Sequence, residues 1–190
     1  MNAKEDREAE QIARDLCKKA YEAWTKGNTL DALQHYEEAL EIFQQLGSLP
    51  DMANVLEKLG DIYHLRQKYD HALKAYKACL DICENFDDEI STSIIAEKIS
   101  FVYREKGDYE RMLPYLYRIL EIAEKYRDPH RAGRALAGLG DVYTFKGNYH
   151  SAKEAYELAL KIFKGMGAIE QTKLLESALR NIEEIEMTNG

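Results

Sequence analysis

"LGDIYHLRQKYDHALKAY" occupies residues 59–76, and "LGDVYTFKGNYHSAKEAY" occupies residues 139–156 of the same chain. The two stretches carry Leu, Gly, Asp, Tyr, Tyr, Ala and Tyr at matching places. An array of stacked units needs the same contacts between each pair of neighbours, whereas an enzyme gains little from a repeated helical pattern. The repetition therefore predicts a chain built from similar units, each packed against the next.

The same spacing extends over the whole chain. Turn residues recur every forty positions, as Gly27-Asn28, Gln67-Lys68, Gly107-Asp108 and Gly147-Asn148. The stretch that follows each turn has apolar residues with helical periodicity, and a second helical pattern precedes each turn. The sequence therefore predicts four units of helix, turn and helix, and an all-α protein.

Small residues mark the expected joints between helices. Gly60 and Gly140 leave room where two helices approach closely, and the rings of Tyr76 and Tyr156 are predicted to cover them. Ala32, Ala72 and Ala152 are expected to keep the second helix of a unit close to the first. Left-handed backbone is expected at Gly27, Gly107 and Gly147. The segments "LPD" (49–51) and "RDP" (127–129) are predicted to start new helices.

The third unit departs from this pattern. Ser100 replaces the glycine, Leu116 replaces the tyrosine, and Met112 and Ile119 replace alanines. Pro114 falls inside the expected second helix, where a proline removes a backbone hydrogen bond at a cost of about 3 kcal/mol or kinks the helix. We favour compensated packing at this joint over a functional hinge, and a bent superhelix is the sharper alternative.

Composition limits the classes of function. The chain has 190 residues, of which 45% are hydrophobic and 32% charged, and its formal net charge is −8. This charge argues against nucleic acid or an anionic membrane as the main ligand. No apolar run approaches the roughly 20 residues needed to cross a bilayer, and the N-terminus does not resemble a secretory signal, so we expect a cytoplasmic protein.

Motifs for chemistry are missing. The sequence contains no phosphate loop, no Gly-x-Ser-x-Gly and no His-Glu-x-x-His, and its five histidines have no metal-binding spacing. Three cysteines do not make an even disulfide framework, and Cys79 is expected to be a core residue. We therefore expect no catalytic residue, no metal and no cofactor, and predict that the chain is not an enzyme.

At this point the chain resembles the tetratricopeptide repeat (TPR) family. The residues that carry the resemblance are Leu139, Gly140, Tyr143, Gly147, Tyr149, Ala152, Tyr156 and Ala159, with a near match at residues 59–76. The usual repeat has about 34 residues, so the longer period resembles the subtype found in kinesin light chains and Pins-type polarity adaptors. The resemblance implies a right-handed α-solenoid of four TPR helix hairpins plus a C-terminal capping helix.

The expected organisation is one TPR array over residues 10–187. Its repeats are placed at 10–48, 49–88, 89–128 and 129–168, and the capping helix at 169–187. The buried face of this helix is expected to carry Ile169, Leu174, Leu175, Ala178, Leu179, Ile182 and Ile185. A charged leader, residues 1–9, either extends the first helix into solvent or covers the groove.

In the family, the first helices of the repeats line a concave groove that binds ligands. Carried over to this sequence, the predicted peptide-binding groove contains Arg14, Lys18, Tyr21, Trp24, Asn54, Lys58, Asp61, His64, Lys98, Phe101, Arg104, Arg134, Asp141 and Phe145. Further groove positions are Cys17, Thr25, Glu57, Leu65, Ile94, Glu97, Glu105, Ala137, Gly138 and Thr144. The implied partner is a protein or peptide ligand, with neither nucleic acid nor membrane.

Two features of this groove have alternative interpretations. Lys18, Lys58 and Lys98 occupy the same place in three repeats, and they either receive acidic ligand groups or pair with neighbouring carboxylates such as Glu57. Exposed aromatic residues are expected to dominate binding energy, although Trp24 is alternatively explained by packing under the leader.

The sequence therefore predicts a scaffold or adaptor that binds a peptide or partner helix in the concave groove. Two alternatives stay open. One is a structural unit that self-associates through its ends or convex face. The other is a regulatory domain that senses a peptide.

Overall fold

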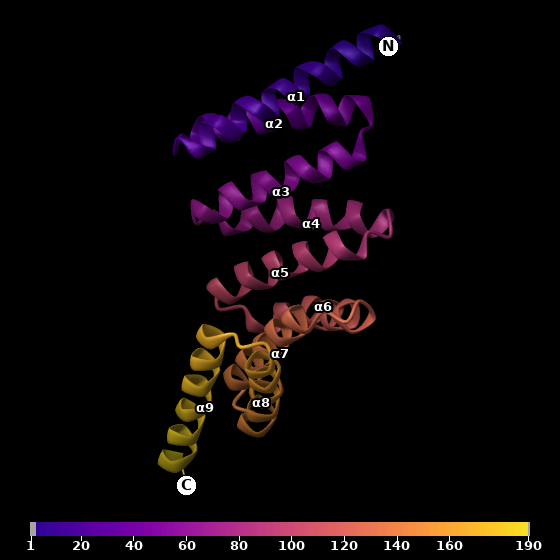
Figure 1. Ribbon diagram of the computed structural model, residues 1–190. Coiled ribbons are helices and arrows are strands. Elements are labelled where there is room, and N and C mark those ends of the chain that lie inside the picture. Colours follow the sequence, from indigo (N-terminus) through magenta and orange to yellow (C-terminus); the bar gives the residue numbers. More distant parts are fainter. Residues whose placement is uncertain (1–2, 190) are drawn as a thin grey trace. The chain divides into compact units, whose positions relative to one another are not determined.

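The computed structural model describes residues 3–189, and within that range every regular element is helical. The elements are α1 (Ala3–Thr25), α2 (Thr29–Leu46), α3 (Leu49–Leu65), α4 (Tyr69–Asn85), α5 (Glu89–Glu105), the 3₁₀ helix η1 (Tyr109–Met112), α6 (Leu113–Lys125), α7 (Pro129–Phe145), α8 (Tyr149–Gly165) and α9 (Ile169–Asn189) (Figure 1). Helices α3, α5, α7 and α9 begin forty residues apart, at 49, 89, 129 and 169. The fold is an all-α solenoid, as the sequence predicts.

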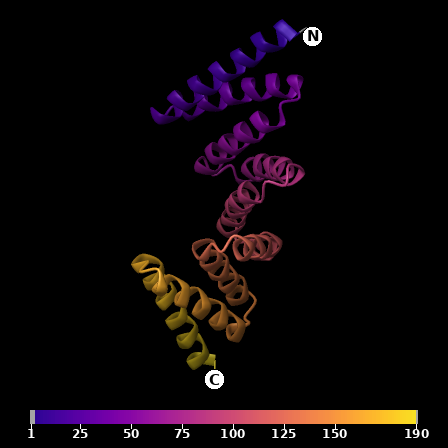
Figure 2. The same cartoon turned by 45° about the vertical axis from the view of Figure 1, so that its right-hand side comes forward.

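The chain divides into two compact units, Met1–Ile95 and Ala96–Gly190, and the boundary lies within α5. In unit 1, α1 packs on α2, α2 on α3, and α3 on α4. In unit 2, α6 packs on α7, α7 on α8, and α8 on α9 (Figures 1 and 2). In each of these two series a helix packs on the next one in sequence, which is the contact pattern of a repeat protein.

A residue with left-handed backbone ends the helix at each turn. The prediction for Gly27, Gly107 and Gly147 is confirmed, with φ of 82°, 71° and 71°. The same conformation occurs at Gly47 and Gly167, and also at three residues with side chains, Gln67, Asp87 and Arg127. The residue after each of these positions donates its backbone N–H to a carbonyl five residues earlier, as Ser48 does to Phe43 at 3.0 Å. This is the hydrogen bond of a Schellman cap.

The predicted close approach at two glycines is confirmed. A Cβ atom placed on Gly60 would lie 2.4 Å from Cε1 of Tyr76, and one on Gly140 would lie 2.3 Å from Cε1 of Tyr156. Only glycine leaves space for these buried rings. Each ring is also held at its far end, because the hydroxyl of Tyr76 donates to Oδ1 of Asp61 at 2.7 Å.

The same bond recurs in the last repeat, where the hydroxyl of Tyr156 donates to Oδ1 of Asp141 at 2.7 Å. Burial is the main cause that raises the pKa of Tyr156, and the nearby charge of Asp141 adds to it. The hydroxyl therefore stays protonated and remains a donor at neutral pH. The sequence analysis predicted the glycine–tyrosine pair but not this aspartate.

Two helices begin at the segments where the sequence predicts a helix start. Helix α3 begins at Leu49 with Pro50 in its first turn. Helix α7 begins at Pro129, and its N-cap Asp128 accepts a hydrogen bond at 2.9 Å from the backbone N–H of Arg131. Both segments therefore begin helices as predicted.

The expectation for Pro114 is wrong. After Gly107 the chain first makes the 3₁₀ turn η1, and α6 begins at Leu113 with the proline in its first turn. The backbone N–H groups of a first turn have no acceptor within the helix, so proline removes no hydrogen bond there. The proline thus marks a late helix start, and it neither breaks nor kinks an established helix.

Helix α9 buries a narrower face than expected. Leu175 and Ile182 are 5% and 1% exposed and join a core cluster with Phe163, whereas Ile169 and Leu174 are 67% and 71% exposed. On a helix the two exposed residues lie roughly a third of a turn to either side of the buried line. Their assignment to the buried face is therefore wrong.

Other expectations fall at the N-terminus and in the core. Residues 3–9 belong to helix α1, while Met1 and Asn2 of the predicted leader lie outside the described residues. Cys79 is 2% exposed, which confirms it as a core residue. Across the range 3–189, no helix combines the length and apolar character that a membrane span requires.

Candidate functional site

Unit 2 contains a cavity of about 470 Å³. Its lining comes from the C-terminal half of α5, from α7, α8 and α9, and from the apolar residues of η1 and α6, which we call its floor. Four charged residues line it, Glu97 and Arg104 from α5 and Arg134 and Asp141 from α7. The cavity therefore lies mainly between the first helices of two consecutive repeats.

The four charges form two ion pairs across the cavity wall. The Nη1 atom of Arg104 lies 3.5 Å from Oδ2 of Asp141, and Nε of Arg134 lies 3.6 Å from Oε1 of Glu97. The guanidinium of Arg104 also lies 4.8 Å from the centre of the Phe101 ring, a distance suited to a cation–π contact. Two positive and two negative groups leave the lining without net charge.

The floor is apolar and closely packed. Met112, Leu116 and Ile119 are each 3% exposed or less. Leu116 lies directly against Gly138, where an added Cβ would be 2.7 Å from its Cδ2 atom. A ligand that entered the cavity would therefore meet hydrocarbon below and ion pairs at the wall.

The cavity is located where the third repeat departs from its neighbours. The positions that hold Gly60, Asp61 and Tyr76 in the second repeat hold Ser100, Phe101 and Leu116 in the third. All three replacements line the cavity. Because leucine is smaller than tyrosine and has no hydroxyl, this repeat has neither the ring nor the aspartate hydrogen bond that fill the joint in the second and fourth repeats.

Two residues of the lining, both on α5, contain a buried polar atom without a hydrogen-bond partner. Oγ of Ser100 and Oε1 of Glu97 are inaccessible to solvent and have no hydrogen-bond partner among the described residues. Ser100 as a whole is 5% exposed. The two residues are three positions apart, so they lie on one face of the helix.

Several predicted groove residues converge on this cavity. Phe101, Arg104, Arg134 and Asp141 line it, and so do the further groove positions Glu97, Ala137 and Gly138. Phe145 lies elsewhere, 59% exposed and stacked on Tyr109 with ring centres 4.8 Å apart. Lys98 is on α5 but outside the lining.

In unit 1, three predicted groove positions line a second, smaller cavity. Asn54 and Glu57 of α3 and Ile94 of α5 border a volume of about 360 Å³ together with the buried residues Cys79 and Cys83. Burial raises the pKa of the Cys83 thiol, which makes it a poor nucleophile at neutral pH.

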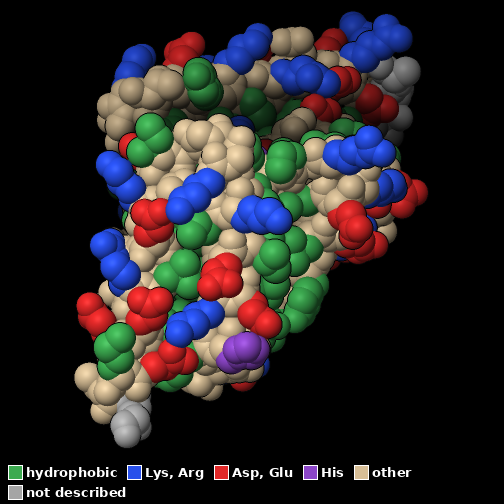
Figure 3. All heavy atoms as spheres, turned by 60° about the horizontal axis from the view of Figure 1, so that its bottom comes forward, with side chains coloured by type: hydrophobic (Ala, Val, Ile, Leu, Met, Phe, Trp, Pro, Cys, Tyr) green, Lys and Arg blue, Asp and Glu red, His purple; other side chains and the backbone are tan. Residues whose placement is uncertain are grey.

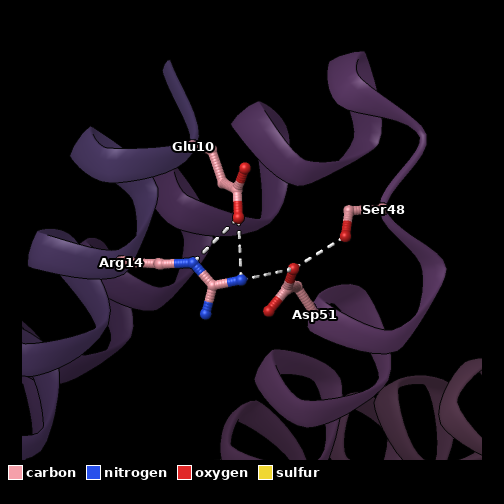
Figure 4. Close-up of polar contacts among 4 residues, drawn as sticks. All are labelled: Glu10, Arg14, Ser48 and Asp51. Carbon is pink, nitrogen blue, oxygen red and sulfur yellow. Dashed lines mark hydrogen bonds and ion pairs between the residues drawn. The ribbon is translucent and has the colours of Figure 1, made fainter. Parts of the chain in front are cut away.

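Arg14 joins two helices of unit 1. It bonds Oε1 of Glu10 at 2.8 Å and lies 3.4 Å from Oδ2 of Asp51, which in turn accepts from the hydroxyl of Ser48 at 2.7 Å (Figure 4). This chain of contacts connects α1 to the start of α3. A ligand would have to compete with these carboxylates for the guanidinium.

The two predicted lysines of unit 1 also have local partners. Lys18 lies 3.2 Å from Oδ1 of Asp15, and Lys58 lies 3.7 Å from Oε1 of Glu57. Exposed pairs of this kind contribute about 0 to 1 kcal/mol. They agree with the interpretation that these lysines pair with neighbouring carboxylates, while the lysine row itself stays a prediction.

The remaining predicted residues of unit 1 differ in exposure. Tyr21 is 61% exposed, whereas Trp24 is half-buried against the core of unit 1. Asp61 accepts the Tyr76 hydroxyl, and the His64 ring centre is 6.1 Å from that of Tyr69. Trp24 thus has a clear packing role, and Tyr21 is the more available aromatic side chain.

Part of the site is not evident from the sequence. Ser100 and Leu116 are visible there only as breaks in the repeat, and α9 is predicted only as a capping helix, although Gln171 and Leu174 of that helix line the cavity. The signal that identifies the site is the replacement of all three members of the Gly–Asp–Tyr set in the third repeat. No group of three or more potential metal ligands occurs in residues 3–189.

Figure 3 shows a face on which both signs of charge alternate with apolar side chains.

Comparisons with known structures agree on the fold. The chain resembles RapI in its apo form, with a TM-score of 0.83 and 16% identity over 93% of this chain and 64% of RapI. It resembles BtubC (BKLC) from P. vanneervenii with a TM-score of 0.64 and 16% identity over 100% of this chain and 94% of BtubC. It resembles a Rap protein complexed with Competence and Sporulation Factor with a TM-score of 0.65 and 19% identity, over 90% of this chain and 48% of that protein.

These identities establish a shared fold and nothing more about activity, and the chain spans less than two thirds of either Rap structure. None of the curated proteins compared with the chain matches it. A family model described as tetratricopeptide repeat, however, matches residues 23–85 and 91–165, which is most of the sequence. Together with the hairpins and the glycine–tyrosine joints, this match shows that the chain belongs to the tetratricopeptide repeat family.

Proposed function

We propose that the protein is an interaction scaffold that binds a peptide or a partner helix through the first helices of its repeats. The observation that carries the proposal is the cavity of unit 2, where Phe101, Arg104, Arg134 and Asp141 converge beside exposed Leu174. Exposed aromatic and arginine side chains next to an apolar floor are the usual anchors of protein interfaces.

The comparisons support binding of a partner in this fold. One protein of similar fold was solved in complex with Competence and Sporulation Factor, and we extend partner binding, but not that ligand, to this chain. The forty-residue spacing of helix starts supports our further proposal that the array spans residues 10–187 and belongs to the longer-helix subtype resembling kinesin light chains and Pins-type adaptors.

The test is capture of a partner from native lysate on immobilised protein, followed by mass spectrometry. Phe101→Ala should weaken binding of the partner by at least about 30-fold, because truncation of a hot-spot residue costs about 2 kcal/mol or more. Tyr126→Ala is the matched control, because Tyr126 is also an exposed aromatic residue of unit 2 but lies outside the cavity. Equal capture by wild type and both variants would contradict the proposal.

Self-association is a second candidate, favoured by the apolar residues that α9 exposes. Ile169, Leu174 and Met187 are 67%, 71% and 81% exposed. Apolar surface at the end of a repeat array is a place where a further repeat or a second copy can stack. Sedimentation velocity over a range of concentrations tests this, and a single monomeric species at the highest concentration would remove it.

A further inference from the structure

The cavity of unit 1, which Asn54 and Glu57 border, differs from that of unit 2 in its charge. Its lining contains two carboxylates, Glu57 of α3 and Asp88, and within the described part of the chain no lysine, arginine or histidine borders it. In the unit 2 cavity, two arginines balance two carboxylates. The unit 1 cavity is therefore negatively charged, whereas the lining of the unit 2 cavity is neutral.

Solvent reaches the residues that carry both charges. The Glu57 side chain is 26% exposed, and Asp88 is an exposed residue between α4 and α5. Oδ1 of Asp88 accepts the backbone N–H of Ser91 at 3.1 Å. Hydrogen bonds from Ser91, first from its side chain, hold the pKa of Asp88 below its ordinary value. The carboxyl group of Asp88 is therefore ionised at neutral pH.

The two carboxylates act on the same part of the cavity. Burial is the main cause that raises the pKa of Cys83, and the negative charges of Asp88 and Glu57 raise it further. Cys83 itself belongs to the lining. Because the interaction between charges weakens with distance, both carboxylates lie near this residue. A cation in the cavity would be attracted by both of them, and an anion would be repelled by both.

The apolar part of the lining suits a hydrocarbon stem. Phe86, the C-cap residue of α4, is 55% exposed, and Ile94 of α5 is partly exposed. Pro50 adds exposed hydrocarbon from the first turn of α3. The face of a phenylalanine ring also attracts a cation within about 6 Å of its centre. Apolar surface beside two carboxylates matches a side chain that has a long hydrocarbon stem and a positive end.

Lys58 of the same chain does not take this place. Its Nζ atom lies 3.7 Å from Oε1 of Glu57, but the lysine side chain is 41% exposed and stands outside the lining. An ion pair between exposed groups at this distance is weak. A second cation can therefore approach Glu57 from the cavity.

We propose that the cavity of unit 1 binds a basic side chain, lysine or arginine, of the partner. The carboxylates of Glu57 and Asp88 attract its positive end, and its hydrocarbon stem rests on Phe86 and Ile94. The inference rests on the proposed function, because the basic side chain belongs to the peptide or helix that the scaffold binds. It adds a requirement for positive charge that the neutral lining of the unit 2 cavity does not impose.

The test uses three small probes of similar size on the full chain, observed by NMR. Butylammonium reproduces the lysine side chain, 1-butanol is neutral, and butyrate is negatively charged. Butylammonium should shift the backbone signals of Ser91 and Ile94 in a saturable way, with a Kd about five-fold or more below that of butanol. Butyrate should give no saturable shift, and high salt should reduce the preference for butylammonium.

Variants that remove one charge test the two carboxylates. Asp88→Asn and Glu57→Gln should each weaken butylammonium about three-fold and leave butanol unchanged. Asparagine caps helix starts as well as aspartate does, so Asp88→Asn is expected to fold. Asp81→Asn is the matched control, because Asp81 is an exposed carboxylate of α4 in the same unit but lies outside the lining. It should bind butylammonium as the wild type does.

Three results would overturn the inference. They are equal affinity for butanol or butyrate, butylammonium affinity unchanged in both Asp88→Asn and Glu57→Gln, and partner capture that is equal for Asp88→Asn and Asp81→Asn. The test is separate from that of the proposed function. Selective butylammonium binding by a protein that captures no partner would remove the scaffold proposal and keep the cation site. Capture that depends on Phe101 without any preference for butylammonium would keep the scaffold and remove the cation site.

Discussion

Replacement of Gly140 by alanine adds one methyl group where a buried tyrosine ring lies against the helix backbone. The new Cβ atom would lie 2.3 Å from Cε1 and 2.4 Å from Cδ1 of Tyr156, whereas carbon atoms in contact are normally about 3.5 to 4.0 Å apart. The ring cannot move without consequence, because it is buried and its hydroxyl is bonded to Asp141.

The cost has three components. Overpacking of this size destabilises by about 1 to 3 kcal/mol. Loss of the hydrogen bond to a charged acceptor adds about 1.5 to 3 kcal/mol. The better helix propensity of alanine returns about 1 kcal/mol. We therefore expect Gly140→Ala to lower the free energy of unfolding by about 1.5 to 5 kcal/mol.

Urea unfolding followed by circular dichroism at 222 nm measures this loss. A double mutant gives the sharper result, because Tyr156→Leu removes the ring that opposes the new methyl group. In that background Gly140→Ala should become neutral or stabilise by up to about 1 kcal/mol. Gly165→Ala is the matched control, since nothing lies within 4 Å of a Cβ atom there and its backbone φ is not positive.

Two outcomes would refute the reasoning. The first is a Gly140→Ala protein as stable as the wild type. The second is a destabilisation that persists unchanged when Tyr156 is already leucine, since the cost would then arise elsewhere than in the contact between ring and backbone.

Three further predictions concern turns, a helix start and alkaline pH. Gln67→Gly and Arg127→Gly should each stabilise by up to about 1 kcal/mol in urea unfolding, because these residues hold side chains at φ of 57° and 52°; a loss of stability would count against strain at these turns. Pro114→Ala should change stability by less than about 1 kcal/mol, since the proline lies in the first turn of α6, whereas a gain near 3 kcal/mol in the same assay would place it inside the helix. Burial raises the pKa of Tyr36 to about 12 from an ordinary value of 10.0, so the folded state favours the neutral phenol. The contribution of this group to the free energy of unfolding is fully present below pH 10 and is lost as pH rises from 10 to 12. Urea unfolding midpoints that stay constant over this window would contradict the prediction.

The sequence predicted the parts of the fold that depend on neighbouring residues. Gly60 and Tyr76 lie in one repeat, and their small-to-large match is visible in the sequence because a helix hairpin brings such positions together. The proline-marked starts at Leu49 and Pro129 are equally local. Pro114 was misassigned because periodicity alone does not distinguish an α-helix that begins directly after the turn at Gly107 from a 3₁₀ turn followed by an α-helix that begins at Leu113.

The candidate site was only partly predictable. Family positions led to Phe101, Arg104, Arg134 and Asp141, because the first helices of the repeats place them on one side. The cavity itself depends on the absence from the third repeat of the tyrosine ring and the aspartate carboxylate found in its neighbours. It also depends on the position of α9, whose residues form part of the lining. An empty volume depends on how all the helices pack, which the sequence does not show directly. Ser100 is therefore visible in the sequence only as a departure from the repeat.

A left-handed residue at every twentieth position, from Gly27 to Gly167, has a consequence for how such a chain changes length. A forty-residue segment exchanged between two of these positions carries one complete hairpin and both of its turns. Duplication or loss of that segment keeps every downstream helix in phase, whereas a single inserted residue within a helix rotates all later contacts by about 100°. A chain with this spacing can therefore gain or lose whole hairpins and keep the helical phase of the hairpins that follow, whereas an insertion inside a helix changes that phase.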